Sequence, residues 1–190
     1  DSYLKSTDPV VKKMIKGLGL KNGSIFFQAF EDDGLVRIYE PGYRLNGAQE
    51  HLIVSQISGI DAKEVYINVA LTGKASEKDL SLISNPKHEQ IACKLSPLVK
   101  LGKIQELSGL EEIKQLDDVV SVNPSYCEGD TVTGEGTLKQ IICRFFIVSE
   151  NKQKLIDTIN KIYSMLHVND IEGNDMLIGK FDTQIVDNLY

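Results

Sequence analysis

The amino-acid sequence predicts an α+β fold, because several strands gather between single helices instead of alternating with them one by one. Residues 24–30 and 35–40 are rich in β-forming side chains and flank Asp32-Asp33-Gly34, a composition typical of a hairpin loop. Residues 138–148 form the strongest strand pattern in the chain. Over residues 155–166, apolar side chains recur at the spacing of one helix face. These three patterns together indicate a mixed fold.

The first part of the chain contains a helix, a hairpin and two further helices. Asp8-Pro9 opens the first helix, and glycines 17 and 19 end it. After the hairpin, Leu52 to Ile57 is apolar enough for a short helix. Asp61 is suited to cap the next helix, which we expect to end at Gly73.

The register of the hairpin decides which polar side chains share a face. A three-residue loop pairs Glu31 with Leu35 and places Gln28 and Glu40 on the same face. A two-residue loop would place these two side chains on opposite faces. We expect the three-residue loop.

Residues 74–88 are the most polar stretch and separate two expected domains, residues 1–80 and 85–190. In the second domain, glycines 129, 134 and 136 mark a hairpin-like crossing between strands. The remaining pattern predicts strands at 89–95, 97–107, 119–122, 138–148, 167–170 and 176–181, and helices at 109–115 and 150–166.

Composition excludes several classes of function. The chain has 190 residues, 42% of them hydrophobic, and its net charge is −6, which argues against a nucleic-acid binder with a broad basic face. No apolar run is long enough for a membrane helix, and no secretory signal begins the sequence. Three separated cysteines fit reduced thiols in the cytoplasm, and three scattered histidines lack the spacing of a zinc site.

The segment from residue 28 to residue 51 carries the candidate chemistry. Glu40 ends a hairpin strand, and a polar loop follows that contains Arg44 and Glu50. Carboxylate and amide oxygens suit Mg²⁺, which usually keeps substrate phosphates among its ligands. An arginine offers paired donors to a phosphoryl group. A solvated hairpin end followed by a polar loop would explain the same residues without any ligand.

The amino-acid sequence of this segment resembles the metal and substrate loop of the ATP-grasp superfamily. The resemblance covers residues 8–75 and implies the C-terminal half of an ATP-grasp domain, an antiparallel hairpin plus helices. The motifs that carry it are Gly17-Leu18-Gly19-Leu20, Asn22-Gly23, Glu40-x-x-x-Arg44, Gln49-Glu50-His51, Ser58-Gly59-Ile60-Asp61 and Leu71-Thr72-Gly73.

The resemblance implies ATP and Mg²⁺ as cofactors and gives roles to six residues. Glu40 resembles the carboxylate that bridges magnesium ions, and Gln28 falls at the first metal-ligand position of the hairpin. Arg44 resembles the catalytic arginine that faces phosphate or acyl-phosphate oxygens. Glu50 resembles the acidic residue of the substrate loop, and Asn46 and Gln49 would line the acceptor side with it.

One position departs from the family pattern. The family usually has asparagine two residues after the bridging glutamate, where this sequence has Gly42. Three explanations stay open: Asn46 substitutes as a ligand, one metal is lost, or the domain is degenerate.

Residues 89–190 resemble the C-terminal domain of L-amino-acid-ligase-like ATP-grasp proteins. The cues are Gly102-Lys103-Ile104, Gly109-Leu110-Glu111-Glu112, Gly129-Asp130 and Asp170-Ile171-Glu172-Gly173. This resemblance implies a smaller α+β domain that acts as a lid or substrate wall.

Together these resemblances imply a carboxylate–amine ligase that uses ATP to form an acyl phosphate from a small carboxylate. The chain lacks room for the upstream ATP-grasp subdomain, so we expect the C-terminal portion of a longer enzyme that is inactive as an isolated chain. Two alternatives remain, a carbamoyl-phosphate-synthetase-like large-subunit piece acting on bicarbonate, which Gln28 favours, and a non-catalytic interaction domain, which Gly42 favours. No nucleic acid or membrane is an expected partner, and a homodimer is left open.

Overall fold

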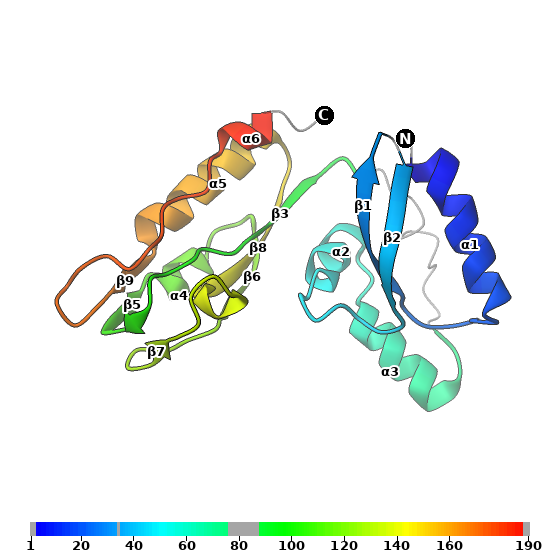
Figure 1. The fold of residues 1–190 in the computed structure, drawn as a ribbon, viewed down its shortest axis with the longest axis horizontal. Helices are drawn as coiled ribbons and strands as arrows, with labels where there is room; N and C mark the ends of the chain where they lie inside the picture. The colour runs from blue at the N-terminus through cyan, green and yellow to red at the C-terminus, as the bar shows by residue number, and fades with distance from the viewer. Residues whose placement is uncertain (1–2, 34, 76–87, 188–190) are drawn as a thin grey trace. The chain divides into compact units, whose positions relative to one another are not determined.

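The computed structural model describes residues 3–33, 35–75 and 88–187, and it mixes helices with small antiparallel sheets (Figure 1). The chain divides into two units, Asp1–Ser84 and Asn85–Tyr190. The α+β fold class is confirmed. None of the helices in the described ranges is both long and apolar enough to cross a membrane.

The first unit is a β-hairpin with helices before and after it (Figure 1). Pro9 stands in the first turn of its first α-helix, where the missing N–H costs no hydrogen bond, and Leu18 caps the helix between the two expected glycines. The elements are a π-helical turn η1 (Tyr3–Thr7), α1 (Asp8–Gly17), β1 (Phe26–Asp32), β2 (Leu35–Gly42), α2 (His51–Ser58) and α3 (Ala62–Thr72).

The hairpin register differs from the expected one near its turn. Asp32 pairs with Leu35, so two residues connect the strands and the expected three-residue loop is wrong. Asp33 has a φ of 48°, the left-handed conformation that two-residue hairpin turns use. The register then shifts by one residue, because β2 contains a β-bulge at Tyr39. The bulge restores the pairing of Gln28 with Glu40, which a regular two-residue hairpin would have lost.

Of the two helices after the hairpin, α2 extends one residue beyond each expected end, and α3 begins and ends as the sequence predicts. The Asp61 carboxylate accepts a hydrogen bond from the Lys63 N–H at 2.8 Å and caps α3. Gly73 ends this helix at a φ of 72°, and its N–H donates to the Val69 carbonyl. The Tyr66 hydroxyl accepts from the Ser24 N–H at 2.9 Å, which joins α3 to the start of β1.

The second unit has a three-stranded antiparallel sheet in the order β3–β8–β6, with α5 packed against β3 and β8. Two two-stranded sheets, β4–β7 and β5–β9, complete it. Its elements are β3 (Ile91–Leu95), β4 (Gly102–Lys103), β5 (Glu106–Ser108), α4 (Leu110–Ile113), β6 (Val119–Pro124), β7 (Thr131–Val132), the 3-10 helix η3 (Leu138–Gln140), β8 (Cys143–Ser149), α5 (Lys152–Met165), β9 (His167–Asn169) and α6 (Gln184–Asp187).

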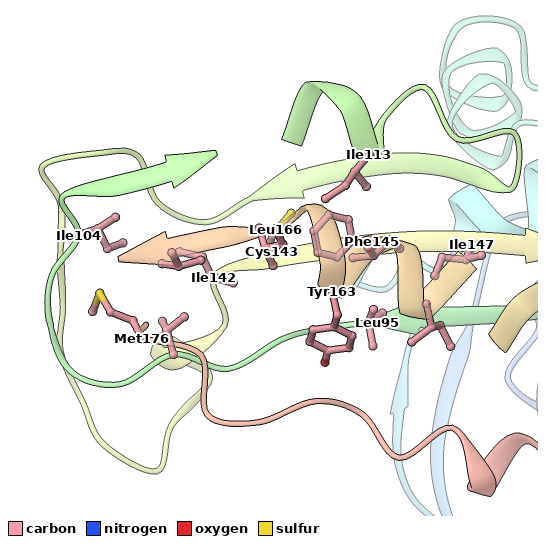
Figure 2. Packing of buried hydrophobic residues seen from close by; sticks show 14 of the residues in the cluster. Leu95, Ile104, Ile113, Ile142, Cys143, Phe145, Ile147, Tyr163, Leu166 and Met176 are labelled. Atoms are coloured by element: carbon pink, nitrogen blue, oxygen red, sulfur yellow. The ribbon is translucent and has the colours of Figure 1, made fainter. Parts of the chain in front are cut away.

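The core of the second unit lies between α5 and the sheet (Figure 2). Phe145 and Ile147 of β8 are fully buried, and so are the apolar positions of the α5 stripe. The predicted helix face is therefore confirmed: Leu155, Ile159, Ile162 and Leu166 are all at most 2% exposed. Burial of such side chains contributes about 1.5–3 kcal/mol each before entropy is counted.

Three expected strands of the second unit are shorter than predicted or absent. Residues 97–107 contain isolated bridges at Leu98 and Val99, then the two-residue strand β4 and the start of β5. Residues 138–140 are a 3-10 helix, since the Thr137 hydroxyl accepts from the Lys139 N–H and the buried Gln140 amide donates to the Val99 carbonyl. Within 176–181 only an isolated bridge between Leu177 and Val99 forms.

Candidate functional site

Two polar side chains face each other across the hairpin of the first unit. Gln28 of β1 and Glu40 of β2 are direct cross-strand partners, and both are exposed. Directly opposed side chains on an antiparallel pair have their Cβ atoms about 5 Å apart. The bulged hairpin therefore presents an amide oxygen and a carboxylate from one face.

The bulge residue Tyr39 holds the amide of Gln28 in place. Its hydroxyl donates a 2.7 Å hydrogen bond to Gln28 Oε1. The Tyr39 ring is stacked on Phe30, with 4.8 Å between the ring centroids. Sequence reasoning missed Tyr39, because a bulge has no reliable signature in a single sequence.

Gly42 is explained by its packing against Phe26. The two residues are cross-strand partners, and a Cβ atom at position 42 would overlap the Phe26 ring. An asparagine at this position would therefore displace that ring. At the position where the family pattern has asparagine, this chain therefore has a glycine, and the Phe26 ring fills the space that an Asn side chain would need.

Arg44 lies two residues beyond the hairpin and is oriented by the same aromatic ring. Its guanidinium carbon lies 4.9 Å from the centre of the Phe26 ring, a cation–π contact. Its Nη1 donates to the Leu45 carbonyl at 3.0 Å, and the Arg44 N–H donates to the Gly42 carbonyl. Phe26 therefore positions Arg44. The sequence did not indicate this role, because an apolar residue at the start of a strand is common.

The loop after Arg44 is held by its own backbone. The Asn46 carboxamide oxygen accepts from the Ala48 N–H at 2.8 Å, and its main-chain carbonyl accepts from the Gln49 N–H at 3.2 Å. Gln49 has a φ of 66°, in the left-handed region. The Asn46 side-chain oxygen therefore closes this turn as an Asx-type hydrogen bond.

A cavity of about 480 Å³ lies behind this loop within the first unit. Asn46, Glu50 and His51 supply polar groups to its wall, whereas Gln49 does not line it. The rest of the wall is largely apolar and includes Ile25, Phe26, Leu45, Val54, Ile60 and Val65. Of the three residues expected on the acceptor side, the structure places Asn46 and Glu50 on one cavity.

The donor set near the hairpin is small. Among the residues that the structure describes, no group of three or more His, Cys, Asp or Glu side chains could hold a metal ion. Gln28 and Glu40 together offer oxygen donors of the kind that Mg²⁺ prefers. They fit a magnesium ion that takes its other ligands from phosphates and water, and they do not fit a cage made by protein alone.

Comparison with known proteins supports the fold. No family model matches the sequence, and no curated protein matches it. The structure is similar to an L-amino acid ligase from Bacillus licheniformis, with a TM-score of 0.66 and 19% identity over 85% of this chain and 42% of that one. It is also similar to a phosphoribosylglycinamide synthetase from Anaerococcus prevotii, with a TM-score of 0.68 and 22% identity over 90% of this chain and 42% of that one.

Both of these structures are ATP-grasp enzymes. The chain spans less than half of the length of either one. The chain has the fold of a part of each of these two enzymes.

Proposed function

We propose that this chain is part of an ATP- and magnesium-dependent carboxylate–amine ligase that forms an acyl-phosphate intermediate. The observation that carries the proposal is the direct pairing of Gln28 with Glu40, followed by Arg44 two residues beyond the hairpin. This arrangement lies in a fold shared with two ATP-grasp enzymes, one of them an L-amino acid ligase.

In this proposal each polar side chain has a separate task. ATP with Mg²⁺ supplies the phosphoryl group and neutralises its charge during transfer. Glu40 and Gln28 hold the metal through their oxygens, and Arg44 stabilises the charge that develops on the phosphoryl oxygens. Asn46, Gln49 and Glu50 belong to the loop that meets the second substrate.

Two other functions each have one observation in their favour. The amide of Gln28, where a carboxylate is the commoner ligand, favours a carbamoyl-phosphate-synthetase-like piece that activates bicarbonate. The Phe26 ring that fills the space beside Gly42 favours a degenerate domain that has lost a metal ligand. Bicarbonate-dependent ADP release by the full-length protein would identify the first function. The absence of ADP release with every substrate would identify the second.

We further propose that an upstream ATP-grasp subdomain is the partner of the first unit. Its hairpin is a two-stranded sheet, an arrangement that is marginally stable alone. Phe30, Leu35 and Tyr39 expose more than half of their surface on it. Without that subdomain the chain would bind ATP poorly and would be inactive.

We also propose that the protein acts in the cytoplasm. All three cysteines, Cys93, Cys127 and Cys143, are free in the structure. Free thiols are typical of a reducing compartment.

The test is Glu40→Gln in the full-length protein, measured as ADP release with single amino acids or bicarbonate as the carboxylate. We expect the substitution to reduce turnover by at least about 10²-fold, because it removes the charge that holds the metal. Glu31→Gln is the matched control, since Glu31 is exposed on the same hairpin and pairs with Val36. Equal activity of both variants would contradict the proposed role of Glu40.

A further inference from the structure

His51 lies at the wall of the cavity but has no role in the site described so far. It is the first residue of α2, and its side chain lines the cavity together with Asn46 and Glu50. Leu45 and Asn46, which line the same cavity, directly follow Arg44 in the chain. Two residues of the cavity wall therefore directly follow the proposed phosphoryl-binding residue in the chain.

The imidazole of His51 has unused hydrogen-bonding capacity. Both ring nitrogens are buried, and neither has a hydrogen-bond partner among the described residues. The Ser55 hydroxyl, one helical turn further along α2, is in the same situation. Buried polar atoms in native proteins are paired in the great majority of cases. Within the described part of the chain, the imidazole therefore lacks the partner that buried polar atoms usually have, on a residue that lines the cavity.

The surroundings of His51 favour its neutral form. Burial is the largest cause that lowers the pKa of His51, and the nearby Lys63 of α3 lowers it further. Asp61 and Glu50 act in the opposite direction without reversing the shift. Lys21 and Tyr66 are the other titratable groups on the cavity wall. At neutral pH the imidazole is therefore free to accept a proton.

We propose that His51 accepts the proton from the amine that attacks the acyl phosphate, and that this amine carries an apolar side chain. The inference rests on the proposed ligase function. An ammonium group has no lone pair for attack, so a base must first remove one proton. The mostly apolar wall suits an aliphatic amine, and the Glu50 carboxylate on the same wall suits its charge before deprotonation.

The chemical step balances with the groups named. The ammonium gives one proton to the imidazole, and the resulting amine lone pair forms the new C–N bond at the acyl carbon. The bond between that carbon and the phosphate oxygen breaks, and the phosphate leaves with the second proton lost by the nitrogen. The imidazolium then returns its proton to solvent.

The experiment compares two nucleophiles in the full-length protein at mildly acidic pH. L-Leucinamide has a blocked carboxylate and is largely protonated there, so it needs a base. Hydroxylamine is largely unprotonated and attacks an acyl phosphate without one. ATP is supplied with each of the common L-amino acids in turn as the carboxylate, and amide and hydroxamate products are quantified by mass spectrometry.

For His51→Gln we expect leucinamide ligation to fall by about 10²-fold or more, the usual contribution of a general base. Hydroxamate formation should stay near the wild-type rate, which also shows that the variant is folded. Ser55→Ala is the matched control, because it alters the same helix face without removing the base, and it should keep both reactions. Wild-type ligation should decline at low pH, once His51 becomes protonated.

Each other outcome overturns a specific statement. If His51→Gln keeps leucinamide ligation, or loses both reactions equally, His51 is not the proton acceptor, whereas the ligase function stands. Wild-type hydroxamate formation without any leucinamide product overturns the apolar amine. If the wild type releases no ADP with either nucleophile, the ligase proposal fails and this inference fails with it.

Discussion

At the scale of single residues, the environment of a side chain decides its chemistry. Cys143 is fully buried, and burial raises its pKa to about 12. Cys93 is half-buried, with a pKa also raised by burial, whereas Cys127 is exposed. Only the thiolate form of a cysteine is an effective nucleophile.

We therefore expect iodoacetamide to modify Cys127 first, Cys93 more slowly, and Cys143 only after unfolding. Peptide mass spectrometry at successive times would give the order. Cys127→Ser should remove the fast phase and leave the slower labelling unchanged. Rapid labelling of Cys143 in the native protein would contradict the burial described for β8.

The sequence identified the residue types of the candidate site but not the contacts between them. Glu40 and Arg44 became candidates through their chemistry and spacing together with the resemblance to the ATP-grasp loop. Phe26 and Tyr39 could not, because each acts through a neighbour that only the fold supplies: Phe26 through the Arg44 guanidinium and Tyr39 through the Gln28 amide.

At the scale of elements, a buried carboxylate joins the end of β8 to α5. Asp118 is 7% exposed and accepts hydrogen bonds from the Ser149 and Thr158 hydroxyls, at 2.7 and 3.3 Å. The Lys154 ammonium lies 3.3 Å from its other oxygen. Removing the carboxylate leaves two buried hydroxyls without an acceptor.

We expect Asp118→Ala to lower the free energy of unfolding of the second unit by about 3 kcal/mol, the usual cost of unpaired buried polar groups. The neighbouring Asp117 is exposed, so Asp117→Ala should change the free energy of unfolding by less than about 0.5 kcal/mol. Urea denaturation followed by circular dichroism would measure both. Similar values for the two variants would show that the buried network contributes little.

Elements with a strong periodic pattern were predictable, whereas short or irregular ones were not. The α5 stripe and the Asp61 cap of α3 follow from local sequence, because one helix face and one turn determine them. The 3-10 helix at 138–140 is joined through Gln140 to Val99, which belongs to a distant segment. Long-range pairing of that kind leaves no periodic signal.

At the scale of the whole chain, the two units differ in how much apolar surface they bury. Among the described residues, the buried hydrophobic side chains of the first unit are Val11 and Ile60. All others belong to the second unit, whose core lies between α5 and the sheet. Stability in proteins follows buried apolar area, so the two units should not be equally stable.

We expect amide hydrogen exchange in the isolated chain to be slowest in α5 and β8 and much faster in β1 and β2. Phe145→Ala should speed exchange throughout the second unit, because truncation of a buried phenylalanine costs about 3–5 kcal/mol. It should leave the first unit unchanged. Exchange followed by mass spectrometry would test this, and equal protection of both units would contradict it.

The bulge at Tyr39 also bears on how related sequences should be aligned. An odd number of residues, 29–39, separates the two facing oxygen donors, although the turn between their strands has two residues. Tyr39, which has no partner in β1, accounts for the odd number. The hairpin therefore contains one residue more than a regular ladder would need. Relatives that lack it should form the same donor pair with an uninterrupted ladder. A single-residue gap in an alignment of this hairpin is thus no sign that the proposed metal-binding pair has been lost.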